Sequence, residues 1–477
     1  MGVEVHELEG ISLHGILEYT KDVYGNAPAI TDCADIRISH SFRDLLHDVD
    51  RLSAGLHAAI KQKSHIVLCA ENSYNWIVAF FSIICSGNIV VPLDYNLTSS
   101  EFRRALEFVD VDILVSDKEI KECSTQCIEL DAFIKEYAIE KEDRYRQNIN
   151  DPAIFLATSG VMSSPKYVML SQQNIVYSTL NGLDAVPIPA FQRAYSILPF
   201  HHSYELSCGL LYHLCSGSHI YINDKKKNFI HNLRVVRPQY IVAVPSIVRS
   251  LMTMLKTEKE MLGHSPLESL KIIYCGGAAI NPKIIEEFEI YRIKVLQGYG
   301  MTECAPSITF NRLYECTSNT VGKPLRYVKV KIENGEICVK APNVMLGYYK
   351  NDEETKKVLR NGWLYTGDIG FFDGMGNLIL CGRKKNLIVL NTGENVYPEE
   401  IEEKILEKCP LIRYCRVYES EGKVAASIYC PDLSEIELHE MINRINSEMS
   451  YFKRIQIIRK ETEMPPVTAL GKAYRKL

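Results

Sequence analysis

The segment Gln297-Gly298-Tyr299-Gly300-Met301-Thr302-Glu303 constrains the fold most, because it completes a strand–glycine–helix–strand–glycine pattern. The apolar stretch from Leu270 to Cys275 predicts a strand that ends at Gly276-Gly277. Asn281 is a suitable N-cap for a helix that begins at Pro282, and a second strand is predicted from Ile293 to Leu296. This order is typical of a nucleotide site at the carboxyl ends of parallel strands.

The residues after the second strand offer three kinds of ligand contact. Two glycine turns would let the backbone approach a flat ligand closely. Tyr299 supplies a ring face, Thr302 a hydroxyl, and Glu303 a carboxylate that suits a hard cation such as Mg²⁺. Taken alone, the segment also fits an ordinary α/β turn with a buried tyrosine, so its meaning depends on the rest of the chain.

Length and composition exclude several classes of protein. A chain of 477 residues is too long for one core and predicts two to four domains. The net charge of −5 argues against a nucleic-acid partner. The run from Ile77 to Cys85 is about half of what a membrane helix needs, so we expect no transmembrane segment. The 15 cysteines are scattered and often apolar in context, which predicts a cytoplasmic protein without disulfides or a zinc site.

Strand and helix patterns alternate over residues 1–150, which predicts a mostly parallel sheet covered on both faces. A short apolar strand then leads into a hydroxyl-rich turn from Thr158 to Lys166. Hydroxyls and backbone N–H groups of such a turn can donate to phosphate oxygens, and Lys166 adds a mobile positive charge. A solvated Ser/Thr turn explains the same residues.

Three later turns carry candidate groups. His201-His202 follow a predicted strand from Arg193 to Leu198, and they could act as a general base or as a ligand pair, or be a packed or capping pair. Asp368 lies on a turn where its carboxylate could accept from the vicinal hydroxyls of a ribose. The basic turn Gly382-Arg383-Lys384-Lys385 is a natural hinge, and the α/β pattern beyond it has the size of a small separate domain. Each turn alone fits an ordinary packed or surface turn.

Together these pieces resemble the adenylate-forming superfamily, which comprises acyl-CoA synthetases, aryl-CoA ligases, peptide-synthetase adenylation domains and luciferases. The similarity is strongest from Gly347 to Gly370 and from Gly382 to Glu402. The segment from Leu198 to Glu205 is most similar to the long-chain fatty acyl branch. The resemblance implies an α/β fold with a large N-terminal domain, residues 1–382, of stacked mixed β-sheets with surrounding helices. A small mobile α+β lid domain, residues 383–477, would rotate between two half-reactions.

The resemblance also implies the reaction and its ligands. A carboxylate attacks the α-phosphate of ATP to give an acyl-adenylate and pyrophosphate, with Mg²⁺ present. A thiol then takes the acyl group and AMP leaves. The acid would be a small-molecule carboxylic acid, most simply a fatty acid. The thiol would belong to coenzyme A or to the phosphopantetheine of an acyl carrier protein, and the sequence leaves these two open.

The family roles can be placed on matching positions of this sequence. The implied catalytic residues are Lys472, Thr302 and Glu303, and Glu303 also holds the metal. The implied nucleotide-binding residues are Thr158, Ser159, Gly160, Ser163, Lys166, Gly276, Gly277, Ala278, Gln297, Gly298, Tyr299, Gly300, Asp368 and Arg383. The implied substrate-binding residues are His202, Gly276, Gly300 and Gly393, and Lys385 is the implied hinge.

One departure from the family concerns its phosphate loop, Thr-Ser-Gly-Thr-Thr-Gly-x-Pro-Lys-Gly. Val161-Met162 replace the threonine pair, Ser163 replaces the second glycine, and Tyr167 replaces the last. A charged hydrogen bond contributes about 1.5–3 kcal/mol, so the loss of two would weaken ATP use by roughly a hundredfold or more unless Ser163 and Ser164 compensate.

This departure leaves a second hypothesis, a non-catalytic relative that binds an acyl chain, a nucleotide or a carrier partner. The retained Lys472, Glu303 and Asp368 favour an active enzyme. A different ATP-binding chemistry is disfavoured, because the sequence lacks a G-x-x-x-x-G-K-[ST] loop.

Overall fold

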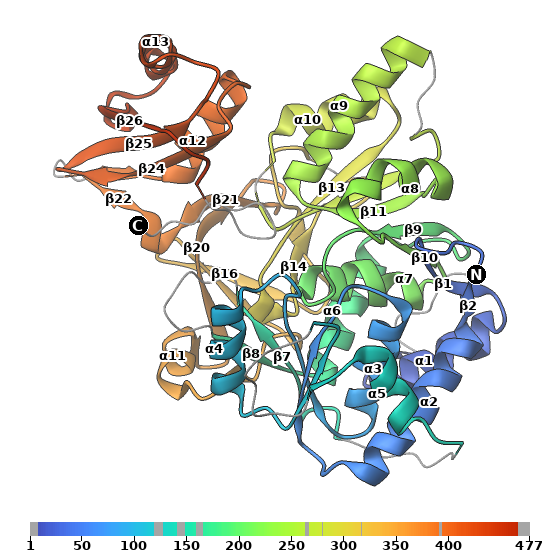
Figure 1. The fold of residues 1–477 in the computed structure, drawn as a ribbon. Coiled ribbons are helices and arrows are strands. Elements are labelled where there is room, and N and C mark those ends of the chain that lie inside the picture. Colours follow the sequence, from blue (N-terminus) through green and yellow to red (C-terminus); the bar gives the residue numbers. More distant parts are fainter. Residues whose placement is uncertain are drawn as a thin grey trace.

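The structure is a computed structural model, and it describes residues 8–118, 127–140, 148–158, 166–262, 267–278, 280–315, 317–390 and 394–465. Figure 1 shows a large body and a smaller lobe that contains α12, α13 and β24–β26. This arrangement confirms the predicted fold class, a mixed α/β protein with a large N-terminal and a small C-terminal part. The boundary after residue 382 stays a prediction.

The first large sheet, called here the β7 sheet, has the strand order β18-β8-β7-β4-β3-β5-β6. The strands from β7 to β6 are parallel, and β8 and β18 add an antiparallel edge. Parallel pairing fits the predicted alternation of strands and helices. The bounds are β3 (His65–Cys69), β4 (Ile89–Pro92), β5 (Ile113–Ser116), β6 (Cys127–Ile128), β7 (Pro152–Ala157), β8 (Tyr167–Ser171) and β18 (Gly347–Tyr348).

The second large sheet, called here the β13 sheet, has the order β15-β14-β13-β12-β11-β9-β10-β1-β2. It is parallel from β13 to β1 and antiparallel at both ends. The bounds are β1 (Pro28–Asp32), β2 (His40–Ser41), β9 (Arg193–Ser196), β10 (His219–Ile222), β11 (Tyr240–Ala243), β12 (Ile272–Cys275), β13 (Lys294–Gly300), β14 (Ser307–Phe310) and β15 (Lys323–Pro324).

Helices cover these sheets, and their ends follow local sequence signals. Ser41 and Ser171 form capping boxes at the starts of α2 and α6, and Asn281 caps α10 with Pro282 in its first turn, as predicted. The bounds are α1 (Leu13–Tyr24), α2 (Phe42–Ala59), α3 (Tyr74–Cys85), α4 (Ser99–Val109), α5 (Leu130–Tyr137), α6 (Gln172–Ala185), the π-helix η2 (Glu205–Leu211), α7 (Tyr212–Cys215), α8 (Phe229–Val236), α9 (Pro245–Leu262), α10 (Pro282–Ile290) and α11 (Asp352–Val358).

Helix α3 illustrates how the core is built. Its sequence is apolar on every side, and Trp76, Phe80 and Phe81 are fully buried in it. A helix that is hydrophobic all round must lie inside the protein rather than on its surface. Within the described ranges, no helix combines the length and the hydropathy that a membrane span requires.

A smaller antiparallel sheet leads the chain out of the large body. It comprises β16 (Lys329–Glu333), β17 (Glu336–Lys340), β19 (Leu359–Arg360), β20 (Trp363–Phe372) and β21 (Leu378–Arg383). The chain then passes through the short 3-10 helix η5 (Lys384–Asn386) into the small lobe. Lys385 is exposed on η5, so the predicted hinge residue lies at the passage between the two parts.

The small lobe has a hydrophobic core of its own, formed by side chains between Ile388 and Ile455. Its elements are β22 (Ile388–Val389), β23 (Asn395–Val396), α12 (Pro398–Lys408), β24 (Tyr414–Ser420), β25 (Lys423–Tyr429), α13 (Glu435–Ser447) and β26 (Ile457–Glu461). An ion pair joins the lobe to the large body, because Lys283 of α10 donates to Glu407 of α12 at 2.7 Å. This exposed pair contributes little to holding the two parts together.

The first testable prediction concerns the hinge. Trypsin at limiting concentration should cut first at the exposed Lys384-Lys385 turn and separate two stable fragments, because each side has its own core. Mass spectrometry of the fragments measures this. Replacing both lysines by glutamine should slow that cut, whereas first cuts inside the β7 or β13 sheet would contradict the predicted boundary.

Candidate functional site

Strand β13 is longer than predicted and contains both glycines of the opening motif. The prediction of a turn at Gly298 and Gly300 is therefore wrong, since both residues lie in the strand. A Cβ on Gly298 would stand 2.3 Å from the Phe310 ring, and one on Gly300 would stand 2.0 Å from the Pro306 carbonyl oxygen. These glycines let β14 and the segment before it approach β13. Gly300 also leaves an exposed backbone position at the end of the strand.

The other glycine pair does form the predicted turn, at the carboxyl end of β12. Gly277 has φ +84°, a left-handed conformation that favours glycine. Gly277 and Ala278 are exposed, so the backbone at this turn is open to a ligand. Gly276 is buried against Tyr204, whose Cζ lies 3.0 Å from the place of a Gly276 Cβ. Gln297, the first residue of the opening motif, is buried in β13 beside Cys275 of β12.

Tyr299 and Asp368 meet across 69 residues of sequence, and Asp368 lies buried in β20 rather than on the predicted turn. The Tyr299 hydroxyl donates to Asp368 Oδ2 at 2.6 Å, and Arg383 Nε donates to Asp368 Oδ1 at 2.8 Å. Burial raises the pKa of Tyr299 well above its usual value, and Asp368 adds to that shift. Burial opposes charge on Arg383, but Asp368, Tyr299 and Glu303 together raise the pKa of its guanidinium. The predicted adenine and ribose residues are thus brought together.

Glu303 lies at the start of the loop that follows β13, in the short 3-10 helix η4 (Thr302–Cys304). The Tyr348 hydroxyl donates to Glu303 Oε1 at 2.7 Å, and burial raises the pKa of Tyr348. Thr302 is partly exposed beside it. Within the described part of the chain, no group of three or more metal-ligating side chains forms. One carboxylate still fits Mg²⁺, which is usually held by one or two carboxylates together with substrate phosphates.

Lys166 connects this carboxylate to the phosphate loop. Its Nζ lies 5.1 Å from the centre of the Tyr348 ring and donates to Glu354 Oε2 of α11 at 2.5 Å. Lys357 donates to the other oxygen of Glu354 at 2.5 Å, and the hydrogen bond from Lys166 leads the causes that lower the Glu354 pKa to about 2. In this arrangement the side chain predicted to meet a phosphate is neutralised by a carboxylate.

The rest of the predicted phosphate loop falls largely outside the described residues. Thr158 lies before the gap, and its N–H donates to the Lys166 carbonyl at 2.9 Å, so both ends of the loop are held together. Tyr167, the replacement for a family glycine, starts β8, where it is buried and stacks on Phe108 at 5.7 Å. All loop residues from 159 to 165 lie outside the described ranges, as do the predicted site residues Gly393 and Lys472.

His202 lies in the turn between β9 and η2, beside His201 at a ring distance of 4.2 Å. Burial lowers the pKa of His202, and burial together with His202 lowers the pKa of His201 to about 3. Both imidazoles are therefore neutral. In the described residues neither Nε2 has a hydrogen-bond partner, and Asp94 Oδ2 approaches His201 Nε2 only to 3.9 Å.

Sequence reasoning gave no role to Tyr348, Glu354 or Glu205. Tyr348 belongs to the Gly347-Tyr348-Tyr349 segment, which resembles the family, but the sequence does not show that its hydroxyl meets Glu303. Glu354 is one of three acidic residues in the first turn of α11, and nothing in the sequence connects it to Lys166, 188 positions earlier. These contacts arise only when the β7 sheet, α11 and η4 meet.

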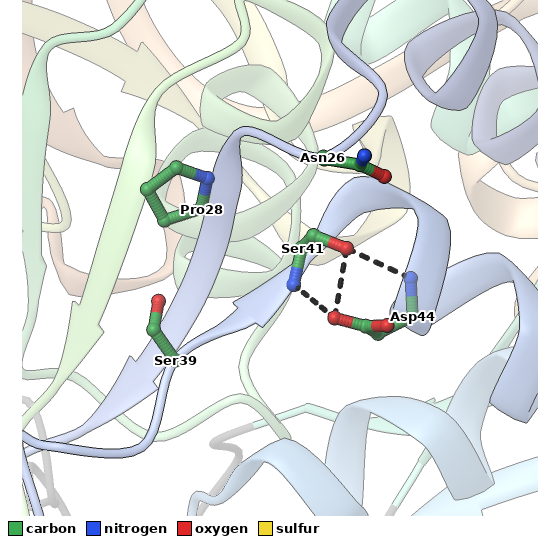
Figure 2. Close-up of a pocket in the computed structure, with 5 residues that line it drawn as sticks. All are labelled: Asn26, Pro28, Ser39, Ser41 and Asp44. Carbon is green, nitrogen blue, oxygen red and sulfur yellow. Dashed lines mark hydrogen bonds between the residues drawn. The ribbon is translucent and has the colours of Figure 1, made fainter.

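A separate hollow lies at the far edge of the β13 sheet, where β1 and β2 pair (Figure 2). It is lined by Asn26, Pro28, Ser39, Ser41 and Asp44. Its polar groups already serve the helix cap, because Ser41 and Asp44 hydrogen-bond each other reciprocally. The hollow contains none of the predicted site residues, and we assign no function to it.

Comparison with known proteins identifies the class that this fold and site define. The model of the family described as AMP-binding enzyme matches residues 17–349. The chain therefore belongs to this family, which confirms the predicted resemblance and the class of an AMP-forming acid–thiol ligase.

Curated relatives share about a quarter of their residues with this chain. A feruloyl-CoA synthase of Amycolatopsis sp is 25% identical over 461 residues, covering 91% of this chain and 92% of its own. A 2-succinylbenzoate–CoA ligase of Bacillus mycoides is 28% identical over 404 residues, with coverages of 80% and 82%. A long-chain-fatty-acid–CoA ligase of Bacillus subtilis is 26% identical over 433 residues, with coverages of 77% and 76%. The fatty acyl branch is not singled out.

Solved structures agree over nearly the whole chain. The o-succinylbenzoate CoA synthetase of Bacillus subtilis, in complex with ATP and magnesium ion, has a TM-score of 0.84 and 25% identity. The match covers 96% of this chain and 98% of the chain of that synthetase. The same enzyme with its acyl-adenylate intermediate has a TM-score of 0.85 at 24% identity, with both coverages 96%.

The second prediction follows from the Lys166–Glu354 pair. Glu354→Gln should lower the KM for ATP roughly two- to fivefold and leave the KM for the acid unchanged, because an amide competes less with phosphate for Lys166. Steady-state kinetics with varied ATP measure this. Glu353→Gln is the matched control, since Glu353 is exposed on the same helix. An unchanged or higher KM for ATP in Glu354→Gln would contradict the competition.

Proposed function

We propose that this protein activates a carboxylic acid with ATP as an acyl-adenylate, releases pyrophosphate, and transfers the acyl group to a thiol. The observation that carries the proposal is the convergence of two groups at the carboxyl end of β13. One is Tyr299–Asp368–Arg383, and the other is Glu303–Tyr348 with Lys166 beside it. They are electrostatically coupled, because Glu303 raises the pKa of Arg383.

The chemistry asks for this combination of groups. A carboxylate must meet a polyphosphate, and both are anions, so catalysis is mainly positioning and positive charge on the reacting oxygens. Asp368 would accept from the ribose, and Tyr299 would contact the base. Lys166 and Arg383 would provide fixed positive charge, and Lys472 would bridge the attacking carboxylate and the phosphate. Glu303 would hold Mg²⁺ with the phosphates.

For the acid, we propose a fatty acid, on the similarity of the segment from Leu198 to Glu205 to the fatty acyl branch. A compact acid is the competing class. The relatives named above include enzymes of ferulate and 2-succinylbenzoate, and another relative is an oxalate–CoA ligase of Arabidopsis thaliana. The Tyr204 ring stands against Gly276, so a long chain would have to pass beside it. A panel of acids distinguishes the two classes.

For the thiol, we propose coenzyme A, in line with the names of the curated relatives. The phosphopantetheine of a carrier protein is the alternative, since it presents the same thiol. The two are distinguished by supplying each acceptor to the enzyme together with the acid that it activates.

A non-catalytic binding protein is the second candidate function. It is favoured by two observations, the replaced threonine pair at Val161-Met162 and the neutralisation of Lys166 by Glu354. Glu303, Asp368 and Arg383 would then bind a nucleotide without turnover. The next two experiments discriminate between the candidates.

The third prediction is acid-dependent exchange of pyrophosphate into ATP. Millimolar ATP and Mg²⁺ are supplied with short to long fatty acids, aryl acids and amino acids. Exchange should occur with one class of acid and be lost in Lys472→Ala, because that charge acts only in the first half-reaction. Lys423→Ala is the control, an exposed lysine of the small lobe. No exchange with any acid would favour the binding protein, whereas full exchange in Lys472→Ala would contradict the role proposed for Lys472.

The fourth prediction concerns the phosphate loop. The double change Val161→Thr and Met162→Thr should raise kcat/KM for ATP by up to roughly a hundredfold, because it restores two hydroxyl donors. Tyr167 is left unchanged, since its buried ring would leave a cavity costing about 3–5 kcal/mol if it were removed. Val161→Ala with Met162→Ala controls for side-chain size. Equal kcat/KM in both double variants would contradict a role for these hydroxyls.

A further inference from the structure

Glu205 is an unusual residue for the interior of a protein. It is the first residue of the π-helix η2 and is fully buried. Ser196, the last residue of β9, donates its hydroxyl hydrogen to Glu205 Oε1, while Oε2 has no partner among the described residues. The carboxyl lies over Gly209, where a Cβ would stand 2.4–2.6 Å from its atoms. A glycine one helical turn later therefore makes room for this carboxyl.

No cation faces the Glu205 carboxyl in the described structure. Besides burial, the charge of Glu205 raises the pKa of Tyr204 and of Cys208, which lie on the same helix. Cys275 of β12 also interacts electrostatically with Tyr204. The other titratable side chains of the elements packed against η2 are Arg193 and Tyr195 on β9, Tyr240 on β11, Tyr177 and Asp184 on α6, and Tyr212, His213 and Cys215 on α7. Arg193 donates to the Arg237 carbonyl instead, and burial lowers the pKa of His213 to about 3, so it is neutral.

We propose that Glu205 is a positioning residue that closes the turn between β9 and η2 and so fixes His202 at the acid site. The role of His202 in this statement rests on the function proposed above. The hydrogen bond from Ser196 to Glu205 joins the two ends of that turn, nine positions apart. His201 and His202 lie inside it.

Two backbone hydrogen bonds also hold the turn at His202, whose N–H donates to the Pro199 carbonyl at 3.1 Å and whose carbonyl accepts from the Leu206 N–H at 3.0 Å. Asn72 fixes its first half, because its side chain donates to the Leu198 carbonyl at 2.7 Å and accepts from the Phe200 N–H at 3.0 Å. Among the described residues the imidazole Nε2 atoms of both histidines lack hydrogen-bond partners, so no hydrogen bond at Nε2 orients either ring. The orientation of His202 therefore depends on packing and on where η2 begins, which is where Glu205 is bound.

The protonation state of Glu205 gives this arrangement a measurable signature. Burial raises the pKa of Glu205 from 4.5 to about 8, although the bond from Ser196 opposes the shift. The folded state therefore holds the proton more tightly than the unfolded state does. The stability contributed by the neutral acid is fully present below about pH 4.5 and is lost as the pH rises to about 8. An ionised carboxylate without a cation would also strain the turn.

The fifth prediction compares the wild-type enzyme with Glu205→Gln from about pH 6 to about pH 9. In the wild type, the KM for the acid should rise several-fold above about pH 8, while the KM for ATP should not show this rise. Glutamine keeps the shape and the acceptor but cannot ionise, so its KM for the acid should stay flat. Glu353→Gln, an exposed change, should reproduce the wild-type profile. A rise that persists in Glu205→Gln would overturn the proposal.

Thermal unfolding supplies a readout that needs no activity. The Tm of the wild type should fall relative to that of Glu205→Gln between about pH 5 and about pH 8, and parallel curves would overturn the proposal. If no acid supports exchange, the proposed function fails while this comparison still tests Glu205. Should Glu205→Gln fail to fold, Ser196→Ala replaces it. Loss of that donor raises the Glu205 pKa further, so the alkaline rise must move to higher pH, and an unmoved rise would overturn the proposal.

Discussion

The buried contact of Asp368 with Arg383 and Tyr299 is the interaction on which the site depends. It joins β13 of the large sheet to the β20–β21 hairpin, and β21 is the strand that leads into the small lobe. One carboxylate therefore joins the residues predicted to face adenine and ribose, and it lies beside the passage of the chain into the small lobe. Asp368 is buried but the Arg383 side chain is 40% exposed, so this half-buried ion pair contributes little net stability, because desolvation and solvent screening offset much of the attraction. The contact mainly fixes the positions of these side chains, and a nucleotide that bound Asp368 would contact the strand that leads to the predicted hinge.

Two neutral phenols hold much of this site in place. Tyr299 and Tyr348 donate to the carboxylates of Asp368 and Glu303, and burial raises the pKa of both phenols. Fixed donors of this kind keep the carboxylates oriented without neutralising their charge, so a cation or a ribose can still be bound. Lys166 differs, since Glu354 neutralises it. The phosphate side is thus the part of the site that a substrate must rearrange.

Local sequence signals predicted the framework well and the tertiary contacts poorly. The Asn281 cap, the strand ending at Cys275 and the turn at Gly276-Gly277 follow from short-range chemistry, and the structure has all of them. Gly298 and Gly300 were expected in a turn, because a glycine pair after a strand signals one. They lie in β13 instead, since β14 approaches that strand too closely for a Cβ. No local sequence pattern predicts the close approach of β14 to β13 or the hydrogen bond between Lys166 and Glu354. The assignment of Lys472 and Gly393 remains a prediction from resemblance.

The central claim is that this site joins an acid to AMP, and one single-turnover experiment tests it most directly. Enzyme in excess over ATP is mixed with Mg²⁺ and an acid in the absence of any thiol, and the products are identified by mass spectrometry. The account predicts an acyl-adenylate bound to the enzyme and one pyrophosphate for each acid consumed. Formation of ADP with an acyl phosphate, or recovery of unchanged ATP with every acid supplied, would contradict it.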